Sequence, residues 1–151
     1  MNLVITDAQK CHVPEIARIE TECFSDPWSE SSICSQLTGP NHVFLVALDG
    51  ERLIGYVGLM YVLDEGYIAN VAVTGEYRRQ HVADALIQEL IRRGEQLQLR
   101  FLTLEVRVSN TPAQTLYQKH GFEPVGLRKK YYEKPREDAL LMTLYLKEED
   151  T

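Results

Sequence analysis

The stretch that most constrains the fold runs over residues 102–122 and has the sequence LTLEVRVSNTPAQTLYQKHGF. Its first seven residues alternate apolar and polar side chains and include β-branched residues, which predicts a strand, and the apolar residues that follow recur at helical spacing. Asn110 is suited to cap that helix, Pro112 fits its first turn, and Gly121 is placed to end it in a left-handed conformation. The stretch therefore predicts a strand followed directly by a helix.

Two side chains that can transfer protons lie on this unit, Glu105 on the strand and Tyr117 on the helix. Because a strand followed by a helix brings both side chains toward one cleft, the stretch predicts one wall of an active site. The residue types alone leave a structural alternative open, since a strand glutamate is usually a solvated residue and such a tyrosine usually packs in a core.

The remaining segments predict a mixed α/β domain of the α+β kind. Further strands are expected at residues 2–6, 43–48, 53–61, 67–73, 122–131 and 139–146, and further helices at residues 13–24, 29–39 and 81–97. The total is about seven strands and four helices. No repeat or linker divides the chain, so residues 1–151 are expected to form a single domain.

Charge and composition exclude several classes of partner. The net charge of −6 argues against general affinity for nucleic acid or an anionic membrane, and favours neutral or basic partners. Three cysteines without a CxxC pair predict no disulfide framework, and Cys11 beside His12 offers too few ligands for a metal. No targeting signal is visible, and the longest apolar run is about half of a membrane span, so we expect a cytoplasmic protein.

A second motif, YRRQHVA at residues 77–83, lies between the strand ending at Val73 and the long helix. Free backbone N–H groups at a helix N-terminus, flanked here by Arg78 and Arg79, suit an anion such as pyrophosphate. The same pattern also occurs in solvated turns, and the glycine-dependent P-loop signature is absent. Alone, the motif leaves both interpretations open.

Three segments together resemble the GNAT superfamily of acetyl-CoA-dependent N-acetyltransferases: the strand NVAV at 70–73, the turn RRQHVADAL at 78–86, and N-x-x-A-x-x-L-Y-x-x-x-G-F at 110–122. Further segments, including PWSE at 27–30 and the pair Tyr131 and Tyr132, resemble the bacterial branch that acetylates the N-terminal alanine of a small-subunit ribosomal protein. The resemblance covers nearly the whole chain, and it implies the GNAT fold.

The resemblance also implies a role for each matching position. Glu105 takes the place of the family's proton acceptor, and Tyr117 that of the tyrosine which protonates the departing thiolate. The implied contacts with the cofactor acetyl-CoA are Val71, Ala72, Val73, Arg78, Arg79, Gln80, His81, Val82, Ala83, Asp84 and Asn110.

One position departs from the superfamily pattern Arg/Gln-x-x-Gly-x-Gly/Ala. Arg78 and Ala83 fit it, but His81 stands at the first glycine. A Cβ there crowds phosphate oxygens or disfavours a positive φ, whereas a histidine in ordinary helical geometry still offers its N–H and adds a donor. We expect acetyl-CoA binding to survive, with any cost falling on affinity rather than on the fold.

The implied chemistry matches these residue types. An amine must lose a proton to attack a thioester, and the departing thiolate benefits from a proton donor, so Glu105 and Tyr117 suffice without a covalent enzyme intermediate. An α-amine of pKa about 7.7–8.0 costs about 1 kcal/mol to deprotonate at pH 7, against roughly 4.6 kcal/mol for a lysine. A single carboxylate base therefore favours an N-terminal amine.

Candidate substrate contacts follow from the resemblance and from charge. Trp28, Tyr131 and Tyr132 are expected to line a peptide entrance, although they also fit core or loop anchors. Four acidic residues are either solubility charges or part of an entrance that attracts a basic ribosomal protein, namely Asp64, Glu65, Glu137 and Asp138.

The main hypothesis is a cytoplasmic enzyme that acetylates the N-terminus of a basic ribosomal protein, with no direct nucleic-acid or membrane partner and no metal. One alternative is a GNAT enzyme acting on a polyamine, an aminoglycoside or a lysine. Another is a non-catalytic acyl-CoA-binding module, to which His81 lends some support. Intact Glu105 and Tyr117 disfavour the module, and the aromatic residues of the predicted entrance favour a peptide substrate.

Overall fold

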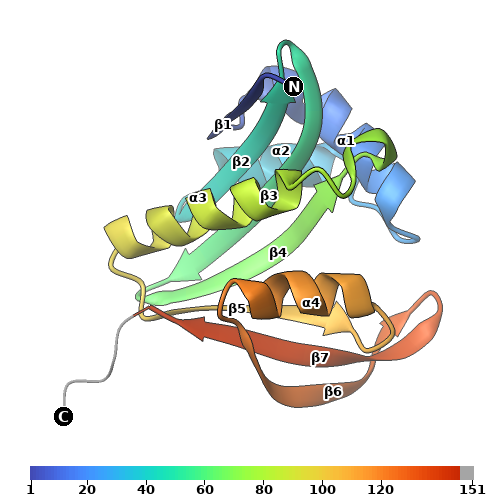
Figure 1. Ribbon diagram of the computed structural model, residues 1–151, viewed down its shortest axis with the longest axis vertical. Helices are drawn as coiled ribbons and strands as arrows, with labels where there is room; N and C mark the ends of the chain where they lie inside the picture. The colour runs from blue at the N-terminus through green and yellow to red at the C-terminus, as the bar shows by residue number, and fades with distance from the viewer. Residues whose placement is uncertain (147–151) are drawn as a thin grey trace.

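The computed structural model describes residues 1–146 and places seven strands in one mixed sheet of order β1-β2-β3-β4-β5-β7-β6 (Figure 1). The strands are β1 (Leu3–Asp7), β2 (His42–Asp49), β3 (Arg52–Val62), β4 (Glu65–Val73), β5 (Phe101–Arg107), β6 (Glu123–Glu133) and β7 (Arg136–Tyr145). The α-helices are α1 (Val13–Cys23), α2 (Glu30–Thr38), α3 (Val82–Gln96) and α4 (Thr111–Lys119), and two short 3-10 helices are η1 (Lys10–His12) and η2 (Gly75–Tyr77). The predicted fold class is confirmed.

The residues that cap helices and form turns at the ends of the predicted elements adopt the expected conformations. The Asn110 side chain accepts a hydrogen bond from the Ala113 N–H at 3.2 Å and caps α4, and Pro112 lies in the first turn of that helix. Gly121 follows the helix with φ of +94°, and Gly50 turns the β2–β3 hairpin with φ of +62°, so both occupy the left-handed region that glycine adopts at no steric cost.

Helices cover both faces of the sheet, α1 and α2 on one face and α3 and α4 on the other (Figure 1). On the α3 side, Leu86 and Leu90 are fully buried against Leu102 of β5. On the α1 side, Ile16 packs with Tyr56 of β3, which is also buried. Burial of this apolar surface on two faces fixes the positions of the strands between them.

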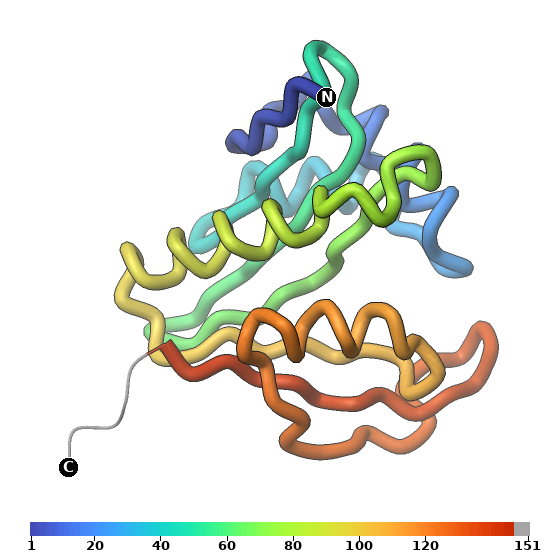
Figure 2. Tube along the Cα trace, in the orientation of Figure 1, coloured from blue at the N-terminus to red at the C-terminus, as the bar shows by residue number. Residues whose placement is uncertain are grey.

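The two central strands separate partway along their length (Figure 2). β4 and β5 are parallel neighbours, but they pair only where residues 65–67 meet residues 101–103. The β3–β4 register shifts between Gly58 and Leu59, which leaves Ala69 as an extra, bulged residue on β4. Beyond the paired segment lies a space between residues 68–73 of β4 and 104–107 of β5, here called the V-shaped gap.

The β6–β7 hairpin lies at the open end of the V-shaped gap. β7 pairs antiparallel with β5 over the whole of β5, so that Arg107 faces Ala139, and β6 forms the outer edge of the sheet. Residues 128–132 of β6 leave the regular register, which brings the Tyr131 and Tyr132 side chains toward the gap. In the part of the chain that is described, no helix is long and apolar enough to cross a membrane.

Candidate active site

A cavity of about 660 Å³ occupies the V-shaped gap. Its walls come from β4, β5, α4, the loop between α1 and α2, and β6. Glu105 of β5 and Tyr117 of α4 both line it, so the strand and helix predicted from residues 102–122 do bring these two side chains to one cleft. Their roles in proton transfer remain predictions.

Tyr117 of α4 lines the cavity. Its side chain is buried and packs against Phe122 with ring centroids 5.8 Å apart. Burial raises the pKa of Tyr117, and nearby Tyr132 adds to the effect. Within residues 1–146 its hydroxyl has no hydrogen-bond partner, although every fully buried side-chain nitrogen or oxygen there has one. The hydroxyl is therefore protonated at neutral pH and accessible from the cavity.

Glu105 forms an ion pair with Arg128 of β6, whose Nε lies 3.1 Å from the carboxylate. The Glu105 side chain is 27% exposed and that of Arg128 is 54% exposed, so the pair stays in contact with solvent. Burial and the Glu105 charge raise the pKa of Tyr131, which therefore stays protonated next to this carboxylate. Glu105 can accept a proton from a group in the cavity and exchange it with water.

Three aromatic residues that the sequence predicted at a peptide entrance do line the cavity, Trp28 from the α1–α2 loop and the pair Tyr131 and Tyr132 from β6. The two tyrosine rings meet edge to face at 5.0 Å, and the Arg107 guanidinium lies 4.3 Å from the centre of the Tyr132 ring. Arg107 also donates to two backbone carbonyls of the hairpin at 2.8 and 2.9 Å. Arg107 of β5 therefore holds the β6–β7 hairpin and the Tyr132 ring in place at this side of the cavity.

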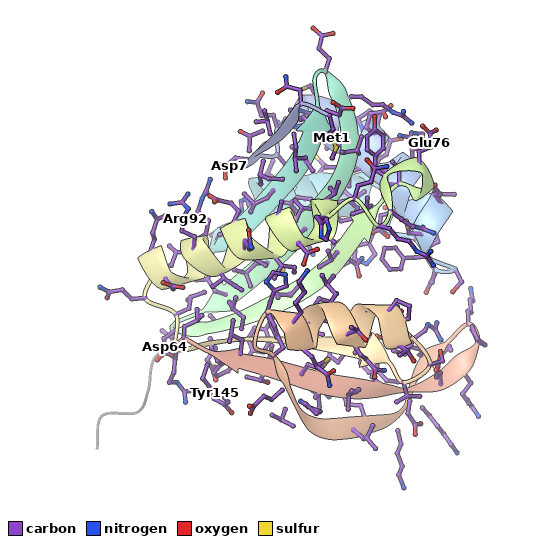
Figure 3. The ribbon with its side chains drawn as sticks, in the orientation of Figure 1. Met1, Asp7, Asp64, Glu76, Arg92 and Tyr145 are labelled. Atoms are coloured by element: carbon purple, nitrogen blue, oxygen red, sulfur yellow. The ribbon has the colours of Figure 1, made fainter. Side chains whose placement is uncertain are left out.

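The predicted acidic entrance is wrong for Asp64 and Glu65. Asp64 lies in the turn that joins β3 to β4, Glu65 is the first residue of β4, and each lies near Arg100, at 3.6 and 3.7 Å. This is the end where β4 and β5 are still paired, and Figure 3 labels Asp64 and Tyr145 toward this same end of the sheet. Charge composition gave no information on which end of β4 opens, and neither residue lines the cavity.

Glu137 and Asp138 lie on the hairpin, but their carboxylates are already engaged. Glu137 accepts from Arg107 at 3.2 Å and from the Ser109 N–H at 2.7 Å, and Asp138 accepts from the Lys130 N–H at 2.8 Å. Hydrogen bonds from Ser109, opposed by burial, lower the pKa of Glu137. These two acids shape the hairpin, which also carries the exposed cations Lys129, Lys130, Lys134 and Arg136.

A second cavity of about 380 Å³ lies at the N-terminus of α3, next to the far end of β4. It is lined by Val73, Tyr77, Arg78, Arg79, His81, Val82, Ala83, Asp84, Pro112 and Leu116. Ala85 donates to the His81 carbonyl in the first intrahelical bond, so the three preceding N–H groups have no intrahelical acceptor. With two adjacent arginines, these groups suit the pyrophosphate of acetyl-CoA.

His81 adopts the conformation of the glycine that it replaces in the pattern. Its φ is +64°, so it is not in ordinary helical geometry, and Arg79 has φ of +63°. Such a conformation costs a non-glycine residue about 1–2 kcal/mol, although histidine is enriched there. The His81 Nδ1 contacts Asp84 at 3.1 Å, which offsets part of the cost.

Four of the predicted cofactor contacts have other roles for their side chains. Arg78 donates to the Val73 carbonyl and to Cys23 Sγ, and Gln80 donates to the Glu76 carbonyl. The Ala72 side chain is buried in the α1 and α2 core, and Asn110 caps α4 while lining the larger cavity. Ala72, Arg78 and Gln80 therefore shape the strand and turn whose backbone faces the cavities.

Other cavity residues were not expected from the sequence, among them Phe24, Ser25, Asp26, Asn70 and Arg107. Asn70 carried a usable signal, because it is a polar residue in the middle of an apolar strand. The three loop residues precede the motif at 27–30 and carried no comparable signal.

Comparison with known proteins agrees with this geometry. Residues 13–122 match the acetyltransferase (GNAT) family. The ribosomal protein bS18-alanine N-acetyltransferase of Escherichia coli is 32% identical over 142 residues, which cover 93% of this chain and 95% of that protein. A Bacillus subtilis protein provisionally assigned the same activity is 38% identical over 137 residues, 90% of this chain and 91% of its own length.

Solved structures show the same architecture. The crystal structure of the Escherichia coli enzyme superposes with a TM-score of 0.90 at 31% identity, covering 98% of this chain and 96% of that one. NAA60 of Arabidopsis thaliana in complex with acetyl-CoA gives a TM-score of 0.87 at 21% identity, covering 95% of this chain and 98% of that one, and shows the likeness of fold alone.

Proposed function

The chain belongs to the acetyltransferase (GNAT) family and is an acetyl-CoA-dependent α-N-acetyltransferase, and from that premise we propose that it acetylates the N-terminal alanine of ribosomal protein bS18. The support for this substrate is the name shared by relatives from Escherichia coli and Haemophilus influenzae, which this chain matches over more than 90% of its length. A ribosomal-protein substrate supports a cytoplasmic location for the proposed reaction.

The residues present fit acetyl-CoA along one continuous path. Beyond residue 67 the edge of β4 that faces β5 has no strand partner, so its backbone groups are available to an extended ligand arm. At the end of that strand, free N–H groups at the start of α3 suit the pyrophosphate. When bound, acetyl-CoA supplies an activated acyl group on a thiol leaving group.

The single observation that carries the reaction is that Glu105 and Tyr117 line the same cavity. Glu105 accepts the proton of the α-amine and passes it to solvent through its exposed side. Tyr117 keeps its proton at neutral pH, because burial raises its pKa, and donates it to the sulfur as the thiolate departs. Direct attack of this kind requires no covalent intermediate on the protein.

The entrance suits a peptide N-terminus. Trp28, Tyr131 and Tyr132 surround the approach with apolar rings that carry polar groups, which is typical of peptide-binding surfaces. Deprotonation of an α-amine at pH 7 costs about 1 kcal/mol, so one carboxylate base is sufficient. The proposal does not require selection of bS18 by its charge, because Asp64 and Glu65 lie near Arg100 at the paired end of β4, and Glu137 and Asp138 are hydrogen-bonded within the hairpin region.

The test is acetyl transfer by the purified protein to four acceptors, followed by mass spectrometry. The acceptors are a peptide with the N-terminal sequence of bS18, the same peptide with a blocked α-amine, a lysine peptide and spermidine. We expect a single acetyl group on the α-amine of the first peptide and none on the second. Transfer to spermidine or to lysine, with none to the free N-terminus, contradicts the proposal.

A further inference from the structure

A buried carboxylate outside both cavities connects the two sides of the larger one. Glu20 is 1% exposed and lies on the face of α1 that also carries Val13 and Ile16. Within residues 1–146 no lysine or arginine forms a salt bridge with it, the nearest such pairs on α1 being those of Glu15 and Glu22 with Arg18. A carboxylate without a counter-ion persists in a core only when hydrogen bonds satisfy it.

Three donors from three different elements satisfy Glu20. The Tyr56 hydroxyl of β3 and the Asn70 Nδ2 of β4 donate to Oε1, the latter at 2.7 Å, and the Trp28 backbone N–H of the α1–α2 loop donates to Oε2 at 3.1 Å. Burial and the charge of Glu20 raise the pKa of Tyr56, so this tyrosine acts as a donor. One side chain thus ties together a helix, two strands and a loop.

Two of these donors belong to residues that line the larger cavity. Asn70 lies on the β4 wall, directly after the bulged Ala69, and the bulge turns its side chain toward α1. Trp28 lies at the entrance, in the loop that leads into α2. Glu20 itself does not line the cavity, so it acts only through these neighbours.

Core packing alone does not require a carboxylate at this position. Replacing a whole buried polar cluster by apolar side chains of similar volume is often neutral or stabilising, whereas removing one member leaves its partners unpaired, here the Tyr56 hydroxyl and the Asn70 amide. The Trp28 N–H is at the end of a loop and can bond to water if the loop moves outward. The hydrogen bonds of Glu20 therefore select one loop position in addition to stabilising the fold.

We propose that Glu20 is a positioning residue for acetyl transfer, which holds the Trp28 loop and the Asn70 segment at a fixed separation. Through Asn70 it sets the wall along which the acetyl group lies, and through Trp28 it sets the approach of the amine. The inference rests on the proposed function, because it assumes a peptide amine that enters past Trp28. A misplacement of about 1 Å in such a site lowers the rate about 10²-fold.

The test compares four variants on α1 and β3. Glu20→Met removes both acceptors at similar volume, and Glu20→Gln keeps one acceptor and is nearly isosteric, so that it remains informative if the methionine variant does not fold. Tyr56→Phe removes one donor that does not belong to the cavity lining. Glu15→Gln is the matched control, an exposed glutamate of the same helix whose carboxylate accepts hydrogen bonds from Arg18.

Each variant is measured for thermal unfolding, for the Kd of acetyl-CoA, and for kcat and KM with the bS18 peptide. We expect Glu20→Met to lower kcat/KM for the peptide by about 10- to 100-fold. Its Kd for acetyl-CoA is expected to change less than about threefold, because the α3 N-terminus keeps its anion contacts. Glu20→Gln should lie between Glu20→Met and the parent, and Tyr56→Phe should lose less than either.

The outcomes separate the inference from the function on which it rests. If the parent protein does not acetylate the peptide, the proposed substrate is wrong. The kcat/KM values of the Glu20 variants and the parent are then compared with the amine that the parent does accept. If folded Glu20→Met or Glu20→Gln keeps kcat/KM within about twofold of the parent and of Glu15→Gln, the positioning role is wrong. A loss that matches only the unfolded fraction also overturns it.

Discussion

The two walls of the V-shaped gap are stabilised in different ways. The β4 wall is fixed through Glu20, which is 1% exposed, and depends on buried hydrogen bonds. The wall made of β5 and β6 depends on partly exposed ion pairs, Glu105 with Arg128 and Arg107 with Glu137. Exposed pairs contribute about 0–1 kcal/mol each and are screened by salt, whereas unpaired buried groups cost more.

The two walls differ in the same way in their proposed tasks: the β4 wall orients the ligand, and the wall of β5 and β6 carries a group proposed for proton transfer. The β4 wall needs a fixed position, because an extended ligand arm must meet its backbone groups in register. The other wall carries Glu105, whose side chain is partly exposed, as its proposed exchange of protons with solvent requires. The comparison predicts that variants of Glu105 and Tyr117 lose turnover with little loss of stability, and that variants between the walls lose stability.

The largest effect is expected for Tyr117→Phe. Its hydroxyl has no hydrogen-bond partner within residues 1–146, so the change removes a proton donor and no structural contact. We expect kcat to fall by roughly 10² to 10⁴ with the Kd of acetyl-CoA unchanged. Steady-state kinetics and calorimetry measure both quantities. An unchanged kcat would assign the acid role to another group.

Glu105→Gln tests the proposed base on the wall made of β5 and β6. We expect kcat/KM to fall by roughly 10² to 10³ near pH 7, because the amine then lacks its proton acceptor. The loss should shrink above about pH 8, where an α-amine is already deprotonated. A pH series from 6 to 9.5 compares the parent with the variant, and Arg128→Gln is the control for loss of the ion pair alone. A loss that is independent of pH contradicts the role of Glu105 as base.

Asp84→Asn tests the contact between the helices next to the two walls. Burial favours a higher pKa for Asp84, but hydrogen bonds from Lys119, His120 and His81 outweigh it and lower this pKa to about 2. Because that value is below the ordinary 3.8, the stabilisation is complete above about pH 4 and is lost as pH falls toward 2.

The free energy of unfolding of Asp84→Asn at pH 7 should be about 1–3 kcal/mol below that of the parent. Urea unfolding at pH 7 and at pH 3 measures the difference, which should be smaller at the lower pH. A difference of the same size at both values would show that the carboxylate charge is not the cause. Glu123→Gln, an exposed change on β6, serves as the control.

His81→Gly should have the smallest effect. Relief of the left-handed backbone, about 1–2 kcal/mol, is opposed by the entropy cost of glycine, about 0.5–1 kcal/mol, and by loss of the Asp84 contact. We expect the stability to change by less than about 1 kcal/mol, with acetyl-CoA bound at least as tightly as by the parent. His81→Ala keeps the Cβ and should be the less stable variant. A large loss of affinity in His81→Gly would show that the imidazole contacts the ligand.

Most of the fold followed from the sequence because its element ends carry local signals. Asn110, Pro112 and Gly121 bounded α4, and the Asp49-Gly50 turn bounded the β2–β3 hairpin. Residues 102–122 also brought Glu105 and Tyr117 together, since one strand and the next helix are connected directly. Relations between distant segments carried no such signal, and for this reason Asp64 and Glu65 were placed at the wrong end of β4.

Glu20 shows which part of the site the sequence contained and which part depended on tertiary structure. Within the predicted helix at residues 13–24, the apolar residues Val13, Ile16, Ala17 and Ile19 recur at helical spacing and define one face. Residue 20 is seven positions after Val13 and four after Ile16, so the helical period places its carboxylate on the same face. A charge on a buried face predicts a partner, but the identities of Tyr56, Asn70 and Trp28 depended on tertiary structure.

The most direct test of the account uses a conjugate in which CoA is joined through an acetyl linker to the α-nitrogen of the N-terminal alanine of a bS18 peptide. If both ligands meet in the V-shaped gap, this conjugate should bind about 10²- to 10⁴-fold more tightly than either CoA or the peptide alone, because the second contact becomes intramolecular. A conjugate joined through a lysine side chain of the same peptide should bind no more tightly than CoA alone. Equal affinity for the two conjugates would contradict α-amine transfer between β4 and β5.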